Sequence, residues 1–194
     1  LDVARHNLSK AENVTFHQAS VDALPFEEGS LDFAYSLGVL HHVPDTAKAI
    51  DSIARLLKPG APFLIYLYYA FEQRPRWFRA LWRASDLLRK GICRLPTGMK
   101  NMVCEAIAFL VYLPICRTAL LLEWLGVLPD SWPLKYYRNR EYYVMRTDAL
   151  DRFGTRLEQR YSRKEIKDML ESAGLTDIRF SDQQPCWCAV GKKK

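Results

Sequence analysis

The sequence predicts an α/β fold, with a mostly parallel sheet, an antiparallel hairpin at its C-terminal end and one helical insertion. Apolar, β-rich runs alternate with helical stretches up to residue 69 and again after residue 148, which is typical of such a fold. The last two apolar runs are separated only by Gln183-Gln184-Pro185, a link that permits only an antiparallel pair. Between these halves, residues 70–147 hold 13 Lys+Arg against 6 Asp+Glu, whereas the rest holds 15 against 16. The basic excess therefore marks an inserted module.

The first half alternates strands and helices. The expected elements are a helix over residues 1–10, strands over 13–20, 31–40 and 63–69, and a helix from Asp45 to Leu57. Asp45 is a favoured N-cap residue, and Lys58-Pro59-Gly60 ends the helix. The strand over 31–40 is almost continuously apolar, which indicates burial on both faces, as in a parallel sheet.

After the insertion, the sequence returns to the body. Ser162 and Glu165 form a capping box that opens a helix, and Gly174 ends it. Two strands follow, over residues 176–182 and 186–190. The predicted organisation is thus a body over 1–69 and 148–194, with an insertion over 70–147.

Composition limits the class of protein. With 194 residues, 49% of them hydrophobic and 26% charged, the chain suits one packed domain with a large insertion, and not a disordered chain. No signal peptide or membrane span is expected, because the longest run without a charged residue covers only residues 59–71. Five cysteines, an odd number without zinc-like spacing, favour reduced thiols, no metal site and a cytoplasmic protein.

The insertion begins with a two-faced helix over residues 74–95. Its basic face holds Arg76, Arg79, Arg83, Lys90 and Arg94. Its apolar face holds Trp77, Leu81, Ala84 and Leu88, and is widened by Phe78 and Trp82. Two further apolar helices are expected over 99–113 and 118–125, separated at Pro114. The favoured interpretation is a lid over a substrate pocket, with the arginines in water. Peripheral membrane contact through 74–95 is the second, and nucleic-acid contact the least favoured, because no RNA-binding motif is present.

Four motifs in the first half carry a resemblance to a known family. They are residues 14–26, Gly29-Ser30-Leu31-Asp32-Phe33, Gly38-Val39-Leu40-His41-His42-Val43 and Leu57-Lys58-Pro59-Gly60. In this order they resemble a class I S-adenosylmethionine-dependent methyltransferase of the small-molecule group called type 11. The resemblance implies a Rossmann-like sheet whose last strand lies antiparallel beside the fifth, and S-adenosylmethionine as cofactor.

The family pattern also contains a glycine-rich loop after the first strand and an acidic residue after the second. No two of the nine glycines here form a GxG. The resemblance therefore implies a body truncated at its N-terminus, with two strands missing between the strands over 13–20 and 31–40. It also implies that this chain alone lacks half of the cofactor site and is inactive.

The resemblance assigns cofactor roles to six residues of the remaining half. They are Ser20, Val21, Asp22, Ser36, Leu37 and Gly38. Ser20 stands where relatives carry an Asp that accepts a hydrogen bond from the adenine amino group, and Val21 N–H faces a ring nitrogen. Asp22 is a weaker substitute for Ser20. The carbonyls of Ser36 and Leu37 face the cofactor's ammonium, and Gly38 permits close backbone approach.

His41 and the lid residues complete the candidate site. His41 is interpreted as a residue that positions the cofactor, with a general-base role as the alternative. Substrate-lid residues are expected among the tyrosines and arginines around the insertion, namely Tyr69, Tyr136, Tyr137, Tyr142, Tyr143 and Arg160. The four tyrosines within the insertion either line a substrate mouth or pack the lid onto the body.

The expected function is methyl transfer from S-adenosylmethionine to a small, apolar or lipid-like acceptor. The reaction requires alignment and exclusion of water but no nucleophilic side chain, so the lack of a catalytic triad does not count against an enzyme. Two alternatives remain open: a methyltransferase-like binding module without activity, and an RNA methyltransferase.

Overall fold

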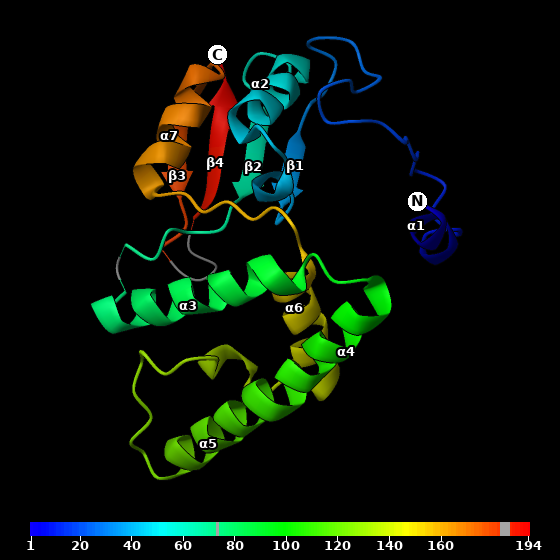
Figure 1. The fold of residues 1–194 in the computed structure, drawn as a ribbon. Helices are drawn as coiled ribbons and strands as arrows, with labels where there is room; N and C mark the ends of the chain where they lie inside the picture. The colour runs from blue at the N-terminus through cyan, green and yellow to red at the C-terminus, as the bar shows by residue number, and fades with distance from the viewer. Residues whose placement is uncertain (73, 183–186) are drawn as a thin grey trace. The chain divides into compact units, whose positions relative to one another are not determined.

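The chain folds into two compact units in the computed structural model, which describes residues 1–72, 74–182 and 187–194. Unit 1 comprises Leu1–Ala70 and Gln159–Lys194, and unit 2 comprises Phe71–Glu158. Figure 1 shows the elements of each. The predicted insertion covers residues 70–147, whereas unit 2 runs from Phe71 to Glu158 and includes the whole of helix α6 (Tyr142–Gly154), which packs within it.

Unit 1 contains a four-stranded sheet in the order β1-β2-β4-β3. Its strands are β1 (Ala34–Leu37), β2 (Pro62–Tyr66), β3 (Leu175–Phe180) and β4 (Cys188–Lys193). Strand β1 pairs with β2 in parallel, whereas β4 is antiparallel to both β2 and β3. The C-terminal antiparallel pair is therefore confirmed, with β4 beside β2. A mostly parallel sheet is wrong for the described strands, because only one of their three pairings is parallel.

Two expected strands differ from the structure. Residues 13–20 form no ladder, and β1 covers four residues of the expected 31–40. A strand requires a hydrogen-bonding neighbour, and no described strand borders the free edge of β1. The apolar run beyond β1 turns at Gly38, whose φ is +74°, into the short 3₁₀ helix Leu40–His42. The link 183–185 and the first residue of the expected last strand, Cys186, lie outside the described residues.

Helices α2 (Thr46–Leu56) and α7 (Arg163–Ser172) pack on one face of the sheet (Figure 1). The carboxylate of Asp45 accepts a hydrogen bond from Lys48 N–H at 2.9 Å, and the Ser162–Glu165 capping box is present, so both predicted caps are confirmed. The short helix α1 (Asp2–Asn7) has no buried residue. The core of unit 1 is formed by Leu40, Ala49, Ile50, Ala54, Leu57, Ala61, Phe63, Ile65, Leu67, Ile166, Leu170, Ala173, Leu175, Trp187 and Ala189.

Unit 2 is built around one long helix. It begins with α3 (Arg76–Ile92), and then α4 (Thr97–Ile107), a π-helical turn (Ala108–Tyr112) and α5 (Leu113–Trp124) form one uninterrupted helix, Thr97–Trp124. The break expected at Pro114 is wrong. Proline cannot donate to the carbonyl four residues earlier and its ring crowds that carbonyl, and the wider π turn just before Pro114 accommodates both effects.

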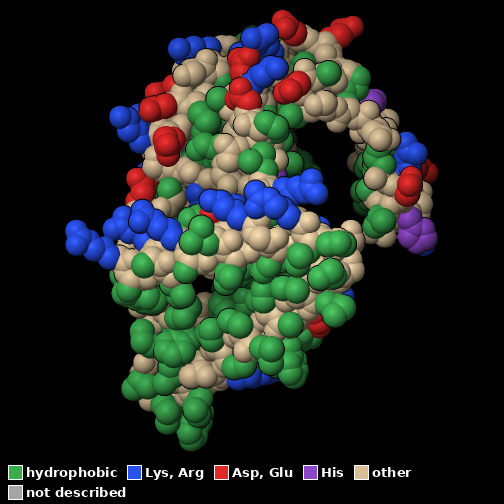
Figure 2. All heavy atoms as spheres, in the orientation of Figure 1, with side chains coloured by type: hydrophobic (Ala, Val, Ile, Leu, Met, Phe, Trp, Pro, Cys, Tyr) green, Lys and Arg blue, Asp and Glu red, His purple; other side chains and the backbone are tan. Residues whose placement is uncertain are grey.

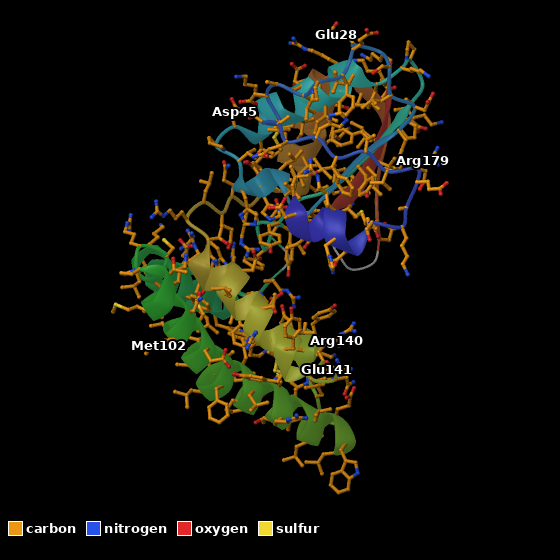
Figure 3. All side chains as sticks on the ribbon, turned by 90° about the vertical axis from the view of Figure 1, so that its right-hand side faces the viewer. Glu28, Asp45, Met102, Arg140, Glu141 and Arg179 are labelled. Carbon is orange, nitrogen blue, oxygen red and sulfur yellow. The ribbon has the colours of Figure 1, made fainter. Side chains whose placement is uncertain are left out.

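The helix Thr97–Trp124 is long and apolar enough to cross a membrane, by length and composition alone. A search of the sequence for long runs without charged residues does not find this helix, because Glu105 and Arg117 interrupt its apolar sequence. Figure 2 shows hydrophobic side chains gathered over α4 and α5. Met102, labelled in Figure 3, points away from the helix and is 73% exposed. The opposite side packs on α6 through a cluster of Cys104, Ala108, Tyr112, Cys116, Met145, Ala149 and Phe153.

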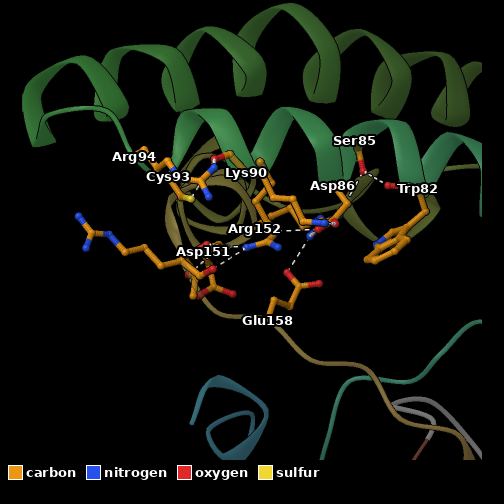
Figure 4. Close-up of polar contacts among 12 residues, drawn as sticks. Trp82, Ser85, Asp86, Lys90, Cys93, Arg94, Asp151, Arg152 and Glu158 are labelled. Atoms are coloured by element: carbon orange, nitrogen blue, oxygen red, sulfur yellow. Dashed lines mark hydrogen bonds and ion pairs between the residues drawn. The ribbon is translucent and has the colours of Figure 1, made fainter. Parts of the chain in front are cut away.

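A polar network joins α3 to α6 (Figure 4). The buried Arg89 guanidinium donates to Asp86 Oδ1 at 2.7 Å and to the carbonyl of Thr155, just after α6, at 2.9 Å. Arg152 donates to Glu158 Oε2 at 2.7 Å and to Ser85 Oγ at 3.2 Å. A cation at a helix C-terminus satisfies the last carbonyls and the helix dipole, so these contacts fix α6 within unit 2.

Candidate functional site

The site in unit 1 lies at the carboxyl ends of β1 and β2. Gly38 N–H donates to Tyr66 O at 3.1 Å, which continues the β1–β2 pairing by one residue. The positive φ of Gly38 favours glycine there, whereas lack of space does not, because an added Cβ would meet no atom closer than 4.0 Å. Ligands of open α/β sheets bind at the carboxyl ends of parallel strands, and this is the end from which the chain turns toward His41.

The return segment from the insertion also meets this edge. Tyr161 N–H donates to Tyr68 O at 2.8 Å, and Ala70 N–H donates to Tyr161 O at 2.9 Å. Gln159 N–H donates to His41 O at 3.0 Å, and the Gln159 side-chain amide donates to Val43 O at 2.6 Å. The chain therefore leaves unit 1 and re-enters it through two paired segments, both held beside the His41 turn.

His41 is the buried ionisable group of this edge. It is 0% exposed, and its ring stacks on Tyr68 with 3.7 Å between centroids. Burial, followed by the charges of His42 and Arg160, lowers the pKa of His41 to about 3, so the imidazole is neutral at pH 7. Neither ring nitrogen has a hydrogen-bond partner within the described residues. This geometry favours the positioning role over the general-base role, because a base needs a nitrogen within reach of its substrate.

Tyr68 is a site residue that sequence reasoning misses. Its ring contacts His41, and the Arg160 guanidinium lies 4.9 Å from its centre, within cation–π distance. The alternation of Tyr66 and Tyr68 along the third predicted strand was the available signal. Tyr161 Oη lies 2.8 Å from Thr46 Oγ1, which itself donates to Leu40 O at 2.7 Å. These bonds tie the return segment to the start of α2.

The expected adenine contacts lie in the turn over residues 20–23. Ser20 O accepts from Ala23 N–H at 3.0 Å, Val21 packs against the core, and Asp22 lies 3.9 Å from Lys48 Nζ in the first turn of α2. Within the described residues, the Ser20 hydroxyl and the Val21 N–H have no hydrogen-bond partner. A free acceptor beside a free donor fits the adenine edge, which offers an amino group and a ring nitrogen.

The other predicted cofactor residues follow β1. Ser36 is buried at 9% exposure within the β1–β2 ladder, and Leu37 is 50% exposed at the end of the strand. Together with Gly38, they place backbone groups at the edge where the ammonium is expected. The residues present thus fit the adenine and ammonium ends of the cofactor, whereas the sequence offers no glycine-rich loop for the rest.

The predicted lid residues fall into two groups. Tyr69 and Arg160 belong to unit 1, where an Arg160 Nη1 lies 3.4 Å from Tyr69 O. Within unit 2, the Tyr137 hydroxyl donates a hydrogen bond to the Asp148 carboxylate. The Tyr142 hydroxyl donates to Glu105 Oε1 at 2.7 Å. The exposed tyrosines of unit 2, Tyr136 and Tyr143, each carry an arginine guanidinium over the ring. The structure therefore uses Tyr137 and Tyr142 to hold the insertion together.

Comparison with known proteins identifies the class of this body. Residues 1–65 match the family model of a methyltransferase domain, the type 11 group. The chain is 39% identical over 61 residues to an uncharacterised methyltransferase, YcgJ, of Bacillus subtilis, and 32% identical over 60 residues to the sterol 4-C-methyltransferase strm-1 of Caenorhabditis elegans. Each alignment covers 31% of this chain. Residues 1–65 are therefore part of a class I S-adenosylmethionine-dependent methyltransferase domain, and the cofactor of that family is S-adenosylmethionine.

The extent of these matches is limited. The aligned residues span only 24% of the B. subtilis relative and 18% of the C. elegans relative. Among solved structures, a protein from Bordetella parapertussis described as a possible exported protein superposes with a TM-score of 0.51 at 16% identity. That match covers 99% of this chain and 49% of the other, and it shows a shared fold.

Proposed function

We propose that this chain is part of a methyltransferase that transfers the methyl group of S-adenosylmethionine to a small, apolar or lipid-like acceptor. In this proposal unit 2 is the lid that selects the acceptor. The observation that carries the proposal is the cluster of His41, Tyr68 and Arg160 at the carboxyl ends of β1 and β2, directly after the matched motifs. The insertion leaves and re-enters the body at this cluster.

The residues of unit 1 have defined roles in this proposal. Ser20 Oγ accepts a hydrogen bond from the adenine amino group, and Val21 N–H donates to a ring nitrogen. The carbonyls of Ser36 and Leu37 accept from the ammonium. His41 stays neutral and packs under the cofactor, and Tyr68 forms an apolar wall. The bound cofactor supplies an activated methyl group, so the protein's contribution is alignment and exclusion of water.

The acceptor class rests on two supports. The C. elegans relative carries a sterol methyltransferase name, and unit 2 exposes large apolar side chains. Cys93, Cys104 and Cys116 are buried thiols, and burial raises the pKa of both Cys104 and Cys116, which suits a protein of the reducing cytoplasm.

Isothermal titration of the full-length protein with S-adenosylhomocysteine tests the cofactor site, and we expect binding. The second measurement supplies a radiolabelled methyl donor together with a sterol, a long-chain quinone or RNA. Label in the sterol or quinone supports the proposal. Binding without any transfer would favour the non-catalytic module, and label in RNA that falls steeply with salt would favour an RNA methyltransferase. No binding by a well-folded full-length protein would overturn the proposal.

A further inference from the structure

Unit 2 exposes a continuous set of large apolar side chains along the helix Thr97–Trp124 (Figure 2). Met102 is 73% exposed, Leu110 68% and Trp124 82%. The set, called here the apolar surface, comprises Met99, Met102, Phe109, Leu110, Val111, Leu121, Trp124, Leu125 and Val127. Monomeric soluble proteins rarely expose contiguous apolar surface on this scale, and such surfaces mark sites of interaction.

Helix α3 carries the charge that accompanies the apolar surface. On its packed side, Phe78 and Trp82 are half-buried and Arg89 is buried, so only the Phe78 and Trp82 edge of the expected apolar face is covered. Trp77, Leu81 and Leu88 are instead at least half exposed. Beside them, Arg76, Arg79 and Arg83 are exposed, and in the part of the chain that the structure describes none of the three has an acidic partner.

The net charge of the chain is unevenly divided between the two units. Unit 2 contains 15 Lys+Arg against 9 Asp+Glu, whereas unit 1 contains 13 against 13. The whole net charge of +6 therefore belongs to the unit that carries the apolar surface. An occupant that suits both features must offer negative charge and an apolar layer together. An anionic lipid bilayer does so, whereas RNA offers phosphate without an apolar layer.

We propose that unit 2 docks on the surface of an anionic lipid bilayer. The exposed side of Thr97–Trp124 and the apolar face of α3 enter the boundary between headgroups and acyl chains. Arg76, Arg79 and Arg83 bind the lipid phosphates, and Trp77 and Trp124 lie at headgroup level. The inference rests on the surface of unit 2 alone, so it stands or falls separately from the proposed methyl transfer.

The same helix contains contacts that argue for lying on the bilayer and not crossing it. On its protein-facing side, Glu105 accepts from Tyr142 at 2.7 Å and lies 3.6 Å from Arg146. Near its end, Glu123 pairs with Arg138 at 2.7 Å. A crossing helix would take these charged groups and the polar side of α6 into hydrocarbon, which is costly. A helix that lies flat keeps them in the protein and in water.

Vesicle co-sedimentation of the full-length protein tests the proposal. The vesicles are phosphatidylcholine alone, or phosphatidylcholine with about one third phosphatidylglycerol. We expect binding to the anionic vesicles that weakens about fivefold for each charge removed in Arg76→Gln, Arg79→Gln and Arg83→Gln, which corresponds to about 1 kcal/mol per charge. The matched control, Lys10→Gln with Lys164→Gln and Lys194→Gln, removes three exposed charges from unit 1 and should keep the parent affinity.

A second variant distinguishes the burial of apolar side chains in the bilayer from the attraction between arginines and lipid phosphates. Phe109→Ser with Leu110→Ser changes two side chains that are 58% and 68% exposed, so the fold should persist, and vesicle binding should fall at least tenfold. Val3→Ser with Leu8→Ser, two exposed positions in α1 and just after it, is the control and should bind as the parent does. Circular dichroism confirms that each variant is folded.

Four results would overturn the proposal. The first is failure of the folded parent to bind anionic vesicles. The second is that the parent protein self-associates and the Phe109→Ser, Leu110→Ser variant is a monomer, while both bind vesicles equally. That result would assign the apolar surface to contact with a second copy of the chain. The third is RNA binding that requires the three arginines while vesicle binding does not. The fourth is resistance of the membrane-bound protein to alkaline carbonate extraction, which would indicate a span.

Discussion

Acidification should destabilise unit 1 through His41. In the unfolded chain this imidazole binds a proton with its ordinary pKa of 6.5, whereas burial lowers the folded-state pKa to about 3. Between these two values the unfolded state binds more protons than the folded state, so the free energy of unfolding falls as pH falls. The contribution is fully present above about pH 6.5 and is lost progressively down to about pH 3.

The size of this effect follows from the two pKa values. From pH 7 to pH 5, proton binding to the unfolded His41 lowers the free energy of unfolding by about 2 kcal/mol. His41 stays neutral in the folded protein throughout this range, so nothing offsets the loss. His41→Phe keeps an aromatic ring against Tyr68 and cannot be protonated. We therefore expect the variant to lose about 2 kcal/mol less than the parent over this interval.

Urea unfolding at pH 5, 6 and 7, followed by fluorine NMR of 5-fluorotryptophan, measures this difference. Trp187 is the single tryptophan of unit 1 among the five of the chain, so its signal reports unit 1 separately. His6→Phe, at an exposed position, is the matched control and should follow the parent. An equal pH dependence in the parent and in His41→Phe would refute the assignment of this effect to the buried imidazole.

Three further outcomes are expected. Ser20→Ala should weaken S-adenosylhomocysteine binding by about 0.5–1.5 kcal/mol in calorimetric titration, the value of one neutral hydrogen bond, while Ser9→Ala leaves it unchanged; equal affinities would remove Ser20 from the adenine contact. Replacing Phe71–Glu158 by a short glycine linker between Ala70 and Gln159 should keep cofactor affinity within about tenfold, or about 1.4 kcal/mol, because the proposed cofactor residues all lie in unit 1. Loss of binding would show that unit 2 contributes to the cofactor site. Ser162→Ala should lower the free energy of unfolding of unit 1 by about 0.5–2 kcal/mol, since the Glu165 N–H loses its acceptor, and an unchanged urea midpoint would contradict this.

Local signals in the sequence predicted the elements whose stabilising contacts are also local. The Asp45 cap and the Ser162–Glu165 box join residues three apart, and both are confirmed. The antiparallel pair of β3 and β4 followed from the short link between them. In contrast, residues 13–20 have strand composition but no ladder, because composition specifies a preference and the neighbouring strand supplies the hydrogen bonds.

The misses in unit 2 have a related cause. Helical periodicity places residues on faces, but it does not say which face meets another helix. On α3 the packed side is the Phe78 and Trp82 edge of the expected apolar face together with Arg89, whose guanidinium satisfies the carbonyls that follow α6. Such a partner is distant in sequence and leaves no periodic signal. For the candidate site, the motif positions were recognisable, whereas the Tyr68–Arg160 contact joins residues far apart in the chain.

The pairing of Tyr68–Ala70 with Gln159–Tyr161 has a consequence for how this protein changes over evolution. Since the two ends of unit 2 are neighbouring backbones, an insertion of any length or composition that returns to the same place leaves the hydrogen bonds of the body intact. We therefore expect sequence changes in unit 2 to leave in place both the hydrogen bonds of the body and the residues that the family model matches.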